Sequence, residues 1–453
     1  MAGPRMVTGI RLDQNLHIDA QSAKPWLWMD ISTSLRARSG QMNGTLRVEQ
    51  SYAKTLTELM APQMRFCRYR QLKRCFQPVD RYPDVSNKPI LASRERDSDI
   101  LSSVRLWGRR LERAVRIPVR TAIRALSTGR RDRNTLPLLG SDTSNEVLLL
   151  AGENWSQYDF DVISRMRRER GTRVAALCQD FIPVTCPQFF AAGEFVSKFT
   201  TYADFLLRYT DLIISNSEST KSDIVNYAND KGGVRGRIEV VTHGADLLSV
   251  KFARKPRLLS DPQARRFVLS VSTIQSRKNF DLLYHLWRRL TEEGVADLPT
   301  LVIVGQPGFG SNDLLWQIEH DPLIRQNIVH LRHAHDEELS WLYQNCLWTL
   351  FPSFYEGWGL PLSESLALGK YCLASNTSSL PEAGAGFAKH IDPLDFAAWR
   401  QAVLELMSSP DALARIEANI RAGYRPVTWA QSAGILAKEL LQLSAKNPAA
   451  HNA

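Results

Sequence analysis

Short apolar runs alternate with longer segments of helical periodicity along most of this chain. The apolar runs are rich in β-branched side chains and are bounded by turn-forming residues, which is the pattern of buried strands. Such regular alternation of strand and helix is typical of a doubly wound α/β fold. The predicted strands are 26–31, 64–69, 147–151, 173–178, 212–215 and 238–242, followed by 267–271, 301–304, 328–331, 347–351 and 371–374.

The two series of strands are separated by a segment that has no regular hydrophobic period. Residues 251–265 are basic and contain proline, which suits a linker between two domains. We therefore predict an N-terminal Rossmann-like domain over residues 1–250 and a second Rossmann-like domain over residues 266–428. A further helical segment lies within residues 429–453.

Composition narrows the class of protein. The chain has 453 residues, of which 44% are apolar and 23% charged, as in a soluble protein of two or three domains. No run approaches the roughly 18 apolar residues of a membrane span, and the N-terminus lacks the apolar stretch of a signal peptide. The six cysteines have no metal-binding spacing, so we expect reduced thiols in a cytoplasmic protein. A net charge of +10 indicates an anionic partner or a plain excess of solvated basic residues.

Arginines are concentrated between residues 94 and 133, where twelve arginines accompany five acidic residues and no lysine. Apolar residues recur at helical spacing from Ile100 to Val115, which predicts a basic amphipathic insertion that bends at Pro118. Such a helix binds an anionic membrane surface or packs, solvated, on its own domain. Nucleic acid is not expected, because stacking aromatic residues are not interleaved with the arginines. We assign membrane contact to Arg105, Arg109, Arg110, Arg113 and Arg116.

Two glutamates, Glu356 and Glu364, lie at the junction of a predicted strand and the helix that follows it. Pro361 suits the start of this helix, and Gly369 suits its end. Open α/β sheets bind ligands at the carboxyl ends of their strands, where two carboxylates can accept hydrogen bonds from a sugar or a ribose. The helix dipole alone explains a single glutamate at this place, but the pair favours a functional site.

Two basic residues, Arg277 and Lys278, follow the predicted strand 267–271 and open a predicted helix that reaches about Leu290. Cations at a helix N-terminus oppose the helix dipole, unless a bound anion reverses the local field. The pair therefore predicts a diphosphate-binding site, with an ordinary surface pair as the alternative.

The segment Tyr355-Glu-Gly-Trp-Gly-Leu-Pro361 resembles the E-x7-E signature of the family 4 retaining glycosyltransferases. Arg277-Lys-Asn279 resembles the Arg-Lys-Asn element of the same family. The resemblance implies the GT-B architecture, in which two Rossmann-like domains face a cleft. It also implies that the last helix, within 429–453, packs back on the N-terminal domain and is followed by a disordered tail.

The same resemblance assigns donor-binding roles to the second domain. Glu356 is expected to contact the donor sugar, Glu364 the nucleotide ribose and Lys278 the diphosphate. Many relatives have arginine where Thr273 stands, so one phosphate contact is missing here or is supplied by Arg277. The expected donor-binding set is Arg277, Lys278, Glu356, Gly357, Gly359, Leu360 and Glu364.

Two features of the first domain have candidate roles near the acceptor. Gln179 and Asp180 resemble the family's His-Asp-hydrophobic-Ile-Pro segment, with glutamine in place of histidine. Glutamine cannot titrate, so no general base is assigned there. The expected catalytic residues are Glu356, Lys278 and Asp180. Asp180 either orients the acceptor hydroxyl or caps the turn. Gly40 and Gly44 allow close approach to phosphate or acceptor, or form a plain tight turn.

Neither metal nor cofactor is expected. The D-x-D spacing that holds a divalent metal in the other large glycosyltransferase fold occurs at Asp97-Ser-Asp99 and Asp159-Phe-Asp161. The first occurrence lies in the arginine-rich segment and the second in a helical pattern, so we interpret both as surface residues. The glycine-rich turn Gly305-Gln-Pro-Gly-Phe-Gly310 lacks the lysine of a Walker loop.

We therefore predict a retaining, metal-independent hexosyltransferase that uses a nucleotide sugar. The resemblance to bacterial mannosyltransferases favours GDP-mannose as donor and a polyprenyl-diphosphate-linked glycan or a polysaccharide as acceptor, in bacterial surface glycan synthesis. The enzyme is expected in the cytoplasm, peripheral at the inner face of the cytoplasmic membrane. The alternatives are a GT-B-fold nucleotide-sugar epimerase, a glycoside hydrolase and a non-enzymatic basic protein that binds membranes or nucleic acid.

Overall fold

A computed structural model describes most of the chain, and we treat only the residues whose positions it defines. These residues are 26–37, 44–61, 63–80, 82, 146–190, 193–246, 253–256 and 266–445. Gly40, most of the expected linker and the whole arginine-rich segment 94–133, including its five assigned membrane contacts, lie outside the described residues.

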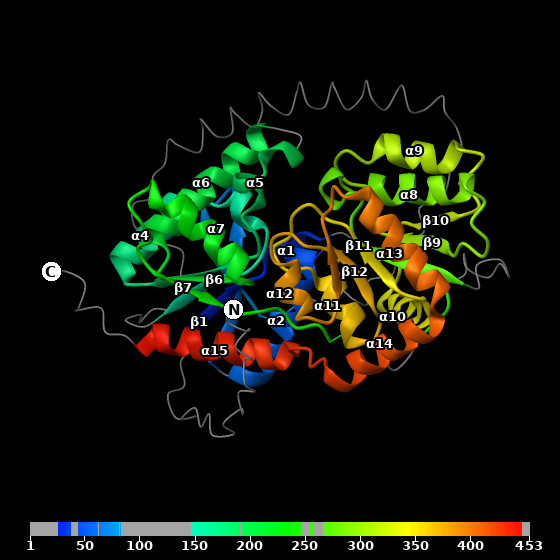
Figure 1. The fold of residues 1–453 in the computed structure, drawn as a ribbon. Helices are drawn as coiled ribbons and strands as arrows, with labels where there is room; N and C mark the ends of the chain where they lie inside the picture. The colour runs from blue at the N-terminus through cyan, green and yellow to red at the C-terminus, as the bar shows by residue number, and fades with distance from the viewer. Residues whose placement is uncertain are drawn as a thin grey trace.

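Two mostly parallel sheets form the centres of two domains (Figure 1). The first sheet has the strand order β3-β2-β1-β4-β5-β6-β7, in which only β3 is antiparallel to its neighbour. Its strands are β1 (Leu27–Asp30), β2 (Met64–Arg70), β3 (Cys75–Val79), β4 (Val147–Leu150), β5 (Arg173–Cys178), β6 (Leu212–Ser215) and β7 (Arg237–Val240). The second sheet has the order β10-β9-β8-β11-β12-β13 and is parallel throughout. Its strands are β8 (Phe267–Val271), β9 (Thr300–Val304), β10 (Ile328–Leu331), β11 (Thr349–Phe351), β12 (Cys372–Ser375) and β13 (Lys389–Ile391).

Helices cover both faces of each sheet, which is the doubly wound arrangement (Figure 1). The helices of the first domain are α1 (Ser32–Arg36), α2 (Gly44–Met60), α4 (Phe160–Arg170), α5 (Ile182–Thr185), α6 (Gly193–Tyr209) and α7 (Glu218–Asn229). Those that follow β8 are α8 (Phe280–Glu292), α9 (Asn312–His320), α10 (Asp336–Asn345), α11 (Leu360–Ala367), α12 (Leu380–Gly384), α13 (Phe396–Ser408), α14 (Pro410–Gly423) and α15 (Trp429–Ala445). Short 3-10 turns lie at Asn154–Gln157, Pro187–Phe189 and Ser276–Lys278.

The strands are buried on both faces because successive side chains point to opposite sides of a sheet. In β4, Leu149 packs with α2 and α15 on one face, whereas Leu148 and Leu150 pack with α4, α6 and α7 on the other. Each of these leucines is at most 2% exposed. Continuous apolar runs are therefore required in these strands, and the predicted α/β fold class is confirmed.

Two strands were absent from the sequence-based prediction. β3 ends the first sheet and contains Pro78, while β13 ends the second sheet and includes a lysine and a histidine. Edge strands have one unpaired side and one more exposed face, so they do not need an apolar run. Their sequences consequently carry no strong strand signal.

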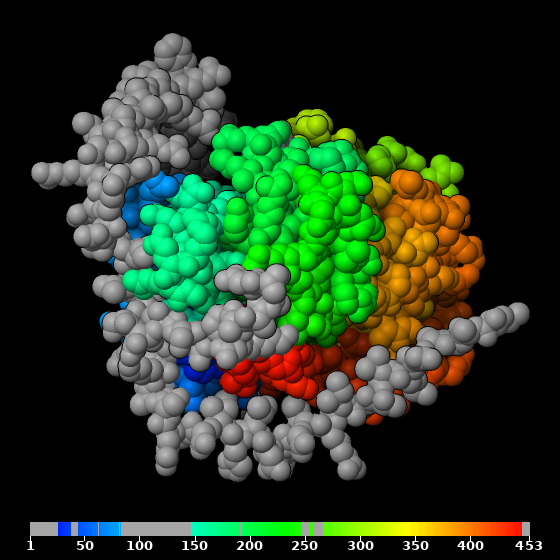
Figure 2. All heavy atoms as spheres, turned by 90° about the vertical axis from the view of Figure 1, so that its left-hand side faces the viewer, coloured from blue at the N-terminus to red at the C-terminus, as the bar shows by residue number. Residues whose placement is uncertain are grey.

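The last helix, α15, leaves the second domain and packs beneath the first (Figures 1 and 2). Trp429 and Leu436 join the core formed by β1, β4 and α2. The Tyr52 and Ser432 hydroxyls form a hydrogen bond of 2.7 Å, and Arg237 forms an ion pair with Glu439. Helix α15 thereby ties the two domains together.

Within the described ranges, every helix is too short or too polar to cross a bilayer.

Candidate functional site

The strand order of the second sheet places two loops side by side. β9 and β10 lie on one side of β8, whereas β11, β12 and β13 lie on the other. The strand order therefore reverses at the β8–β11 pair. In open α/β sheets, ligands bind outside the carboxyl ends of strands at such a reversal. The loop after β8 carries Arg277 and Lys278, and the loop after β11 carries Glu356. The topology therefore brings together residues that are far apart in the sequence.

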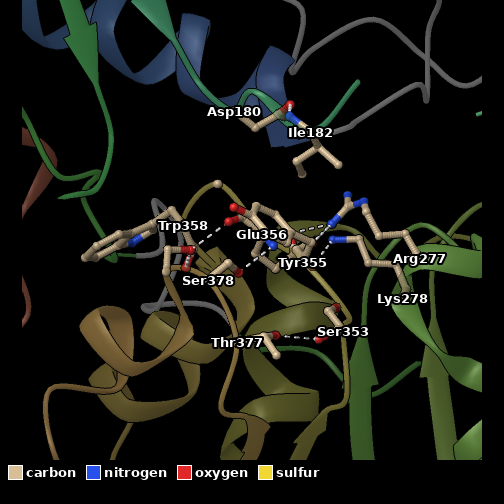
Figure 3. Close-up of polar contacts among 12 residues, drawn as sticks. Asp180, Ile182, Arg277, Lys278, Ser353, Tyr355, Glu356, Trp358, Thr377 and Ser378 are labelled. Atoms are coloured by element: carbon tan, nitrogen blue, oxygen red, sulfur yellow. Dashed lines mark hydrogen bonds and ion pairs between the residues drawn. The ribbon is translucent and has the colours of Figure 1, made fainter. Parts of the chain in front are cut away.

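Glu356 forms a buried ion triad with Arg277 and Lys278 (Figure 3). The Lys278 Nζ lies 2.5 Å from Oε1 of Glu356, and the Arg277 Nη1 lies 3.0 Å from Oε2. The side chains of both cations are 12% exposed, and that of the glutamate is 8% exposed. Arg277 also donates a hydrogen bond to the Tyr355 carbonyl oxygen. The triad leaves one net positive charge in a largely desolvated site.

The charge states of the triad follow from burial and mutual attraction. Burial alone would raise the pKa of Glu356, but the nearby Arg277 and Lys278 lower it to about 2. Burial and the neighbouring Arg277 lower the pKa of Lys278 to about 8, although Glu356 opposes this shift. Glu356 is consequently ionised at neutral pH, and Lys278 is mainly protonated there.

The local backbone differs from the predicted helix start. Arg277 and Lys278 lie in the 3-10 turn Ser276–Lys278, and α8 begins only at Phe280. Asn279 links them in a left-handed conformation with φ of 55°. Glu356 compensates the two cations. The expectation that they open the helix is thus wrong, because the left-handed residue separates the turn from α8.

Hydrogen bonds from the segment after β12 hold the Glu356 loop. The Glu356 N–H donates to the Ser378 hydroxyl at 2.8 Å, and the Ser379 hydroxyl donates to the carbonyl oxygens of Glu356 and Trp358 at 3.0 and 2.9 Å. Gly359 then turns the chain into α11 with φ of 108°, a conformation that favours glycine. Leu360 is the first residue of α11, as its bounds show.

Glu364 lies one turn into α11 and contacts both domains. Its Oε1 lies 2.5 Å from Nη1 of Arg47, which belongs to α2 in the first domain. Its Oε2 accepts a hydrogen bond of 3.1 Å from the Tyr343 hydroxyl of α10. Burial raises the pKa of Glu364, while Arg47 and the Tyr343 hydrogen bond oppose the rise.

Gly357 forms a close contact between the two domains. A Cβ atom at this position would lie 2.0 Å from the Gln179 carbonyl oxygen and 2.9 Å from Cβ of Asp180. The Gly357 carbonyl oxygen accepts a hydrogen bond from Thr220 at 3.3 Å. The backbone at this glycine therefore lies against the backbone of the first domain, and the two domains are in contact here.

Asp180 and Gln179 face this closed junction. Asp180 caps its own turn, because its Oδ1 accepts a hydrogen bond of 3.1 Å from the Ile182 N–H (Figure 3). Burial raises the pKa of Asp180, and Arg277 across the cleft lowers it. The Gln179 side chain donates to the Ala151 carbonyl oxygen at 3.3 Å. The structure shows that Asp180 caps its turn, which is one of the two roles left open for it. The positive charge of Arg277 also acts on the Asp180 carboxylate.

Further polar contacts close the domains around α7. The Glu382 carboxylate accepts hydrogen bonds of 2.8 Å from the N–H groups of Glu218 and Ser219, at the start of α7. The Tyr355 hydroxyl donates to the Asp223 carboxylate at 2.7 Å. A carboxylate is favourable at a helix N-terminus, since it satisfies free N–H groups and complements the dipole.

The remaining candidates lie away from the triad. Gly44 begins α2, and a Cβ there would meet no atom within 4 Å, so space does not require glycine. Asp159 is the N-cap of α4 and forms an ion pair with Arg74. His243 is 4% exposed and stacks on Trp429, with burial lowering its pKa to about 3. Asp97-Ser-Asp99 lies outside the described residues.

Comparison with known proteins connects this geometry to a family. The family model described as "Glycosyl transferases group 1" matches residues 253–423, which contain the triad and Glu364. The match covers the second sheet and its helices as far as α14. The chain is 28% identical over 242 residues to the O-antigen chain mannosyltransferase B of Escherichia coli, covering 51% of this chain and 61% of that protein. It is 24% identical over 271 residues to a serotype-specific mannosyltransferase of Escherichia coli, covering 58% of this chain and 32% of that protein.

Solved structures show the same fold over nearly the whole chain. Sucrose-phosphate synthase from Thermosynechococcus elongatus has a TM-score of 0.59 at 14% identity, covering 93% of this chain and 99% of that one. HepE from Anabaena, in complex with UDP and glucose, has a TM-score of 0.56 at 13% identity, covering 93% and 100%. The GT-B fold and the resemblance to bacterial mannosyltransferases are thereby confirmed. The chain spans about three fifths and one third of the lengths of the two mannosyltransferases described above.

Arg47 is one of the residues at this site that the sequence-based prediction missed. The segment Gly44-Thr-Leu-Arg-Val48 resembles a Gly-hydrophobic-Arg-Val element of the family, but the sequence alone assigns its arginine no partner. Its carboxylate partner lies 317 positions later, in the other domain. The available signal was a charged residue between two apolar residues of α2, Leu46 and Val48, both of which are buried.

Substitution of Gly357 by alanine should hold the two domains apart. The added methyl group would overlap the Gln179 carbonyl oxygen, which cannot move without shifting β5 and its loop. Small-angle scattering should show a larger radius of gyration, with the thermal stability of each domain retained. Gly193→Ala is the matched control, because its Cβ would meet no atom within 4 Å. An unchanged radius of gyration for Gly357→Ala would show that the closed contact is not needed.

Diphosphate affinity should fall as the pH rises through about 8, the pKa of Lys278. A base whose pKa is lowered is protonated below that pH and neutral above it, so the positive field weakens on the alkaline side. Calorimetric titration with a nucleoside diphosphate from below to above this pH measures the effect. Lys278→Arg should bind with little pH dependence, because a guanidinium stays charged. Identical alkaline profiles for both proteins would contradict the assignment of this titration to Lys278.

Proposed function

We propose that the protein is a retaining glycosyltransferase that takes its sugar from a nucleotide sugar bound mainly to the second domain. The observation that carries the proposal is the buried triad of Glu356, Arg277 and Lys278 within a matched group 1 glycosyl transferase domain. A glycoside hydrolase has no use for two cations that contact its carboxylate. A protein that only binds anions has no use for a desolvated glutamate between them.

The triad supplies what transfer from a nucleotide sugar requires. Arg277 and Lys278 would neutralise the diphosphate as negative charge develops on it, which is commonly the largest contribution in such chemistry. Glu356, kept ionised by the same cations, would accept hydrogen bonds from the sugar hydroxyls. Glu364 would accept hydrogen bonds from the ribose. Closure of the first domain over Gly357 would exclude water and favour transfer over hydrolysis.

Retention of the anomeric configuration is consistent with the glutamine at position 179, because glutamine cannot act as a general base. In the proposed step, the acceptor hydroxyl oxygen bonds to the anomeric carbon on the face from which the diphosphate leaves. The bond between that carbon and the diphosphate oxygen breaks, and the diphosphate takes the acceptor's proton. Asp180 would lie beside the acceptor, where its carboxylate can orient the hydroxyl while capping its own turn.

For the donor we propose GDP-mannose, and for the acceptor a polysaccharide or a polyprenyl-diphosphate-linked glycan of a bacterial surface. The support is the similarity to O-antigen mannosyltransferases. We also propose that catalysis needs no divalent metal. A panel of GDP-, UDP- and dTDP-sugars tests the donor, with nucleotide release measured with and without EDTA. Loss of release in EDTA that magnesium restores would refute metal independence. Recovery of an epimerised nucleotide sugar without transfer would support the epimerase alternative.

Replacement of Glu356 by glutamine should lower turnover about a hundredfold or more. This loss corresponds to an increase of about 2.7 kcal/mol in the activation free energy. Glutamine keeps the shape of the side chain but removes the negative charge between Arg277 and Lys278. Its amide nitrogen, which is a hydrogen-bond donor, then faces one of the two cations unfavourably. Glu405→Gln is the control, since it neutralises an exposed carboxylate that pairs with Lys389. Turnover of Glu356→Gln within about threefold of the parent would exclude its role at the donor sugar.

We propose that the first domain docks on an anionic membrane. Besides the arginine-rich segment, the β2–β3 hairpin supports this proposal. Leu72 at its tip is 86% exposed and is flanked by the exposed residues Arg70, Lys73 and Arg74. The tip extends past β1 at the carboxyl edge of the first sheet, the edge that also carries Asp180. An inserted leucine gains up to about 1.5–3 kcal/mol, and each nearby cation about 1 kcal/mol.

Leu72→Asp should weaken co-sedimentation with phosphatidylglycerol vesicles, because a carboxylate replaces the side chain that would enter the bilayer. Neutralising Arg105, Arg109, Arg110, Arg113 and Arg116 together should weaken it further, and added salt should weaken binding by the parent. Leu394→Asp is the control, since Leu394 is 79% exposed but lies in the second domain. Transfer to a short soluble acceptor should survive these changes. Equal sedimentation of all variants would contradict membrane docking by these segments.

A further inference from the structure

Glu364 is held by a cation from the opposite domain. The Arg47 guanidinium lies 2.5 Å from Oε1, and its side chain is 15% exposed against 3% for Glu364. Glu356, by contrast, takes both its cations from its own domain. The two carboxylates of the E-x7-E segment therefore differ in one respect: the partner of Glu364 reaches it only when the domains are closed.

The contacts of Glu364 leave room for a ligand. Arg47 occupies one position on Oε1, and the Tyr343 hydroxyl occupies one position on Oε2 at 3.1 Å. Each carboxylate oxygen can accept two hydrogen bonds. The two remaining acceptor positions equal the number of hydroxyl groups on the ribose of a nucleotide. Arg47 and a bound ribose are thus compatible, and both favour an ionised carboxylate.

The charges around Glu364 make Arg47 important for that ionisation. Burial raises the pKa of Glu364, the carboxylate of Asp336 raises it further, and Arg47 lowers it. Tyr343 donates its hydrogen bond and lowers it too. Without Arg47, the described surroundings of Glu364 contain one neutral donor and one nearby negative charge. A protonated carboxyl group is a poorer acceptor for two hydroxyl groups, because one of its oxygens has become a donor.

We infer that Arg47 is a positioning residue that completes the ribose site from the first domain, so that recognition of the ribose and closure of the cleft favour each other. The inference rests on the proposed function, which assigns Glu364 to the ribose. By linkage, any ligand that binds the Arg47-paired carboxylate more tightly must also shift the protein toward the closed state. A nucleotide that lacks the ribose hydroxyls would occupy the same site without this effect.

A second tie between the domains provides the control. Glu382 caps α7 across the cleft through the N–H groups of Glu218 and Ser219, and it does not contact Glu364. Removing Glu382 weakens closure but leaves the ribose site intact. If Arg47 served only as another tie, Arg47→Ala and Glu382→Ala would alter nucleotide binding in the same way.

The experiment is calorimetric titration with GDP and 2′,3′-dideoxy-GDP, and with the corresponding uridine nucleotides in parallel. The parent should prefer the ribonucleotide. Arg47→Ala should lower GDP affinity about tenfold or more, within the usual range of coupling between sites, and should change dideoxy-GDP affinity little. The preference for the ribonucleotide should therefore nearly vanish. Arg47→Lys should recover part of it, and Glu382→Ala should preserve it even if both affinities fall.

The pH dependence of GDP affinity is a second measurement. A contact that only holds the two domains together would not change it. In Arg47→Ala, GDP affinity should begin to fall at a higher pH than in the parent as the solution is acidified, because Glu364 then takes up a proton more readily. Thermal unfolding of each variant shows whether it is folded. An unchanged ribonucleotide preference in folded Arg47→Ala overturns the inference while leaving the proposed function in place. A parent protein that binds none of the nucleotides overturns the proposed function and the inference with it.

Discussion

The buried triad of Glu356, Arg277 and Lys278 is the interaction on which the rest of the site depends. Removing an ionised carboxylate from water costs several kcal/mol unless opposite charges and hydrogen bonds replace the water. Here two cations do so, and the loops that carry them meet only because β8 and β11 are neighbours in the sheet. The reversal of strand order is therefore the structural basis of the charge arrangement.

The triad also prepares the site for an anion. Two cations and one carboxylate leave a net positive charge, and the low exposure of all three side chains strengthens its field. A diphosphate that arrives here can share the cations without creating an unpaired buried charge on Glu356. Preorganised charge of this kind needs little rearrangement during the reaction, and this is the physical reason to expect a large catalytic effect from it.

The contacts between the two domains are of a different kind. The carboxylate of Glu382 on α7, the hydroxyl of Tyr355 on Asp223 and the Arg47–Glu364 pair are polar, and the Gly357 contact is a close backbone approach. Interfaces of this polar type between domains open and close more readily than an apolar core. The helix α15 keeps the domains connected meanwhile, since its apolar face is part of the core of the first domain. Under the proposed function, polar contacts that can open would let the first domain move so that donor and acceptor can enter.

The sequence by itself determined most strands of both domains, because buried parallel strands require apolar runs. The sequence also identified the E-x7-E and Arg-Lys-Asn segments, because the glycines and charged residues of each segment lie close together along the chain. The short edge strands β3 and β13 escaped, since an edge strand need not be apolar. Only the tertiary structure decided that Glu356 compensates both cations, that Gly357 must lack a side chain against Gln179, and that Arg47 pairs with Glu364. These contacts depend on how two sheets are placed relative to each other, and the period of hydrophobic residues within one strand or helix carries no information about that placement.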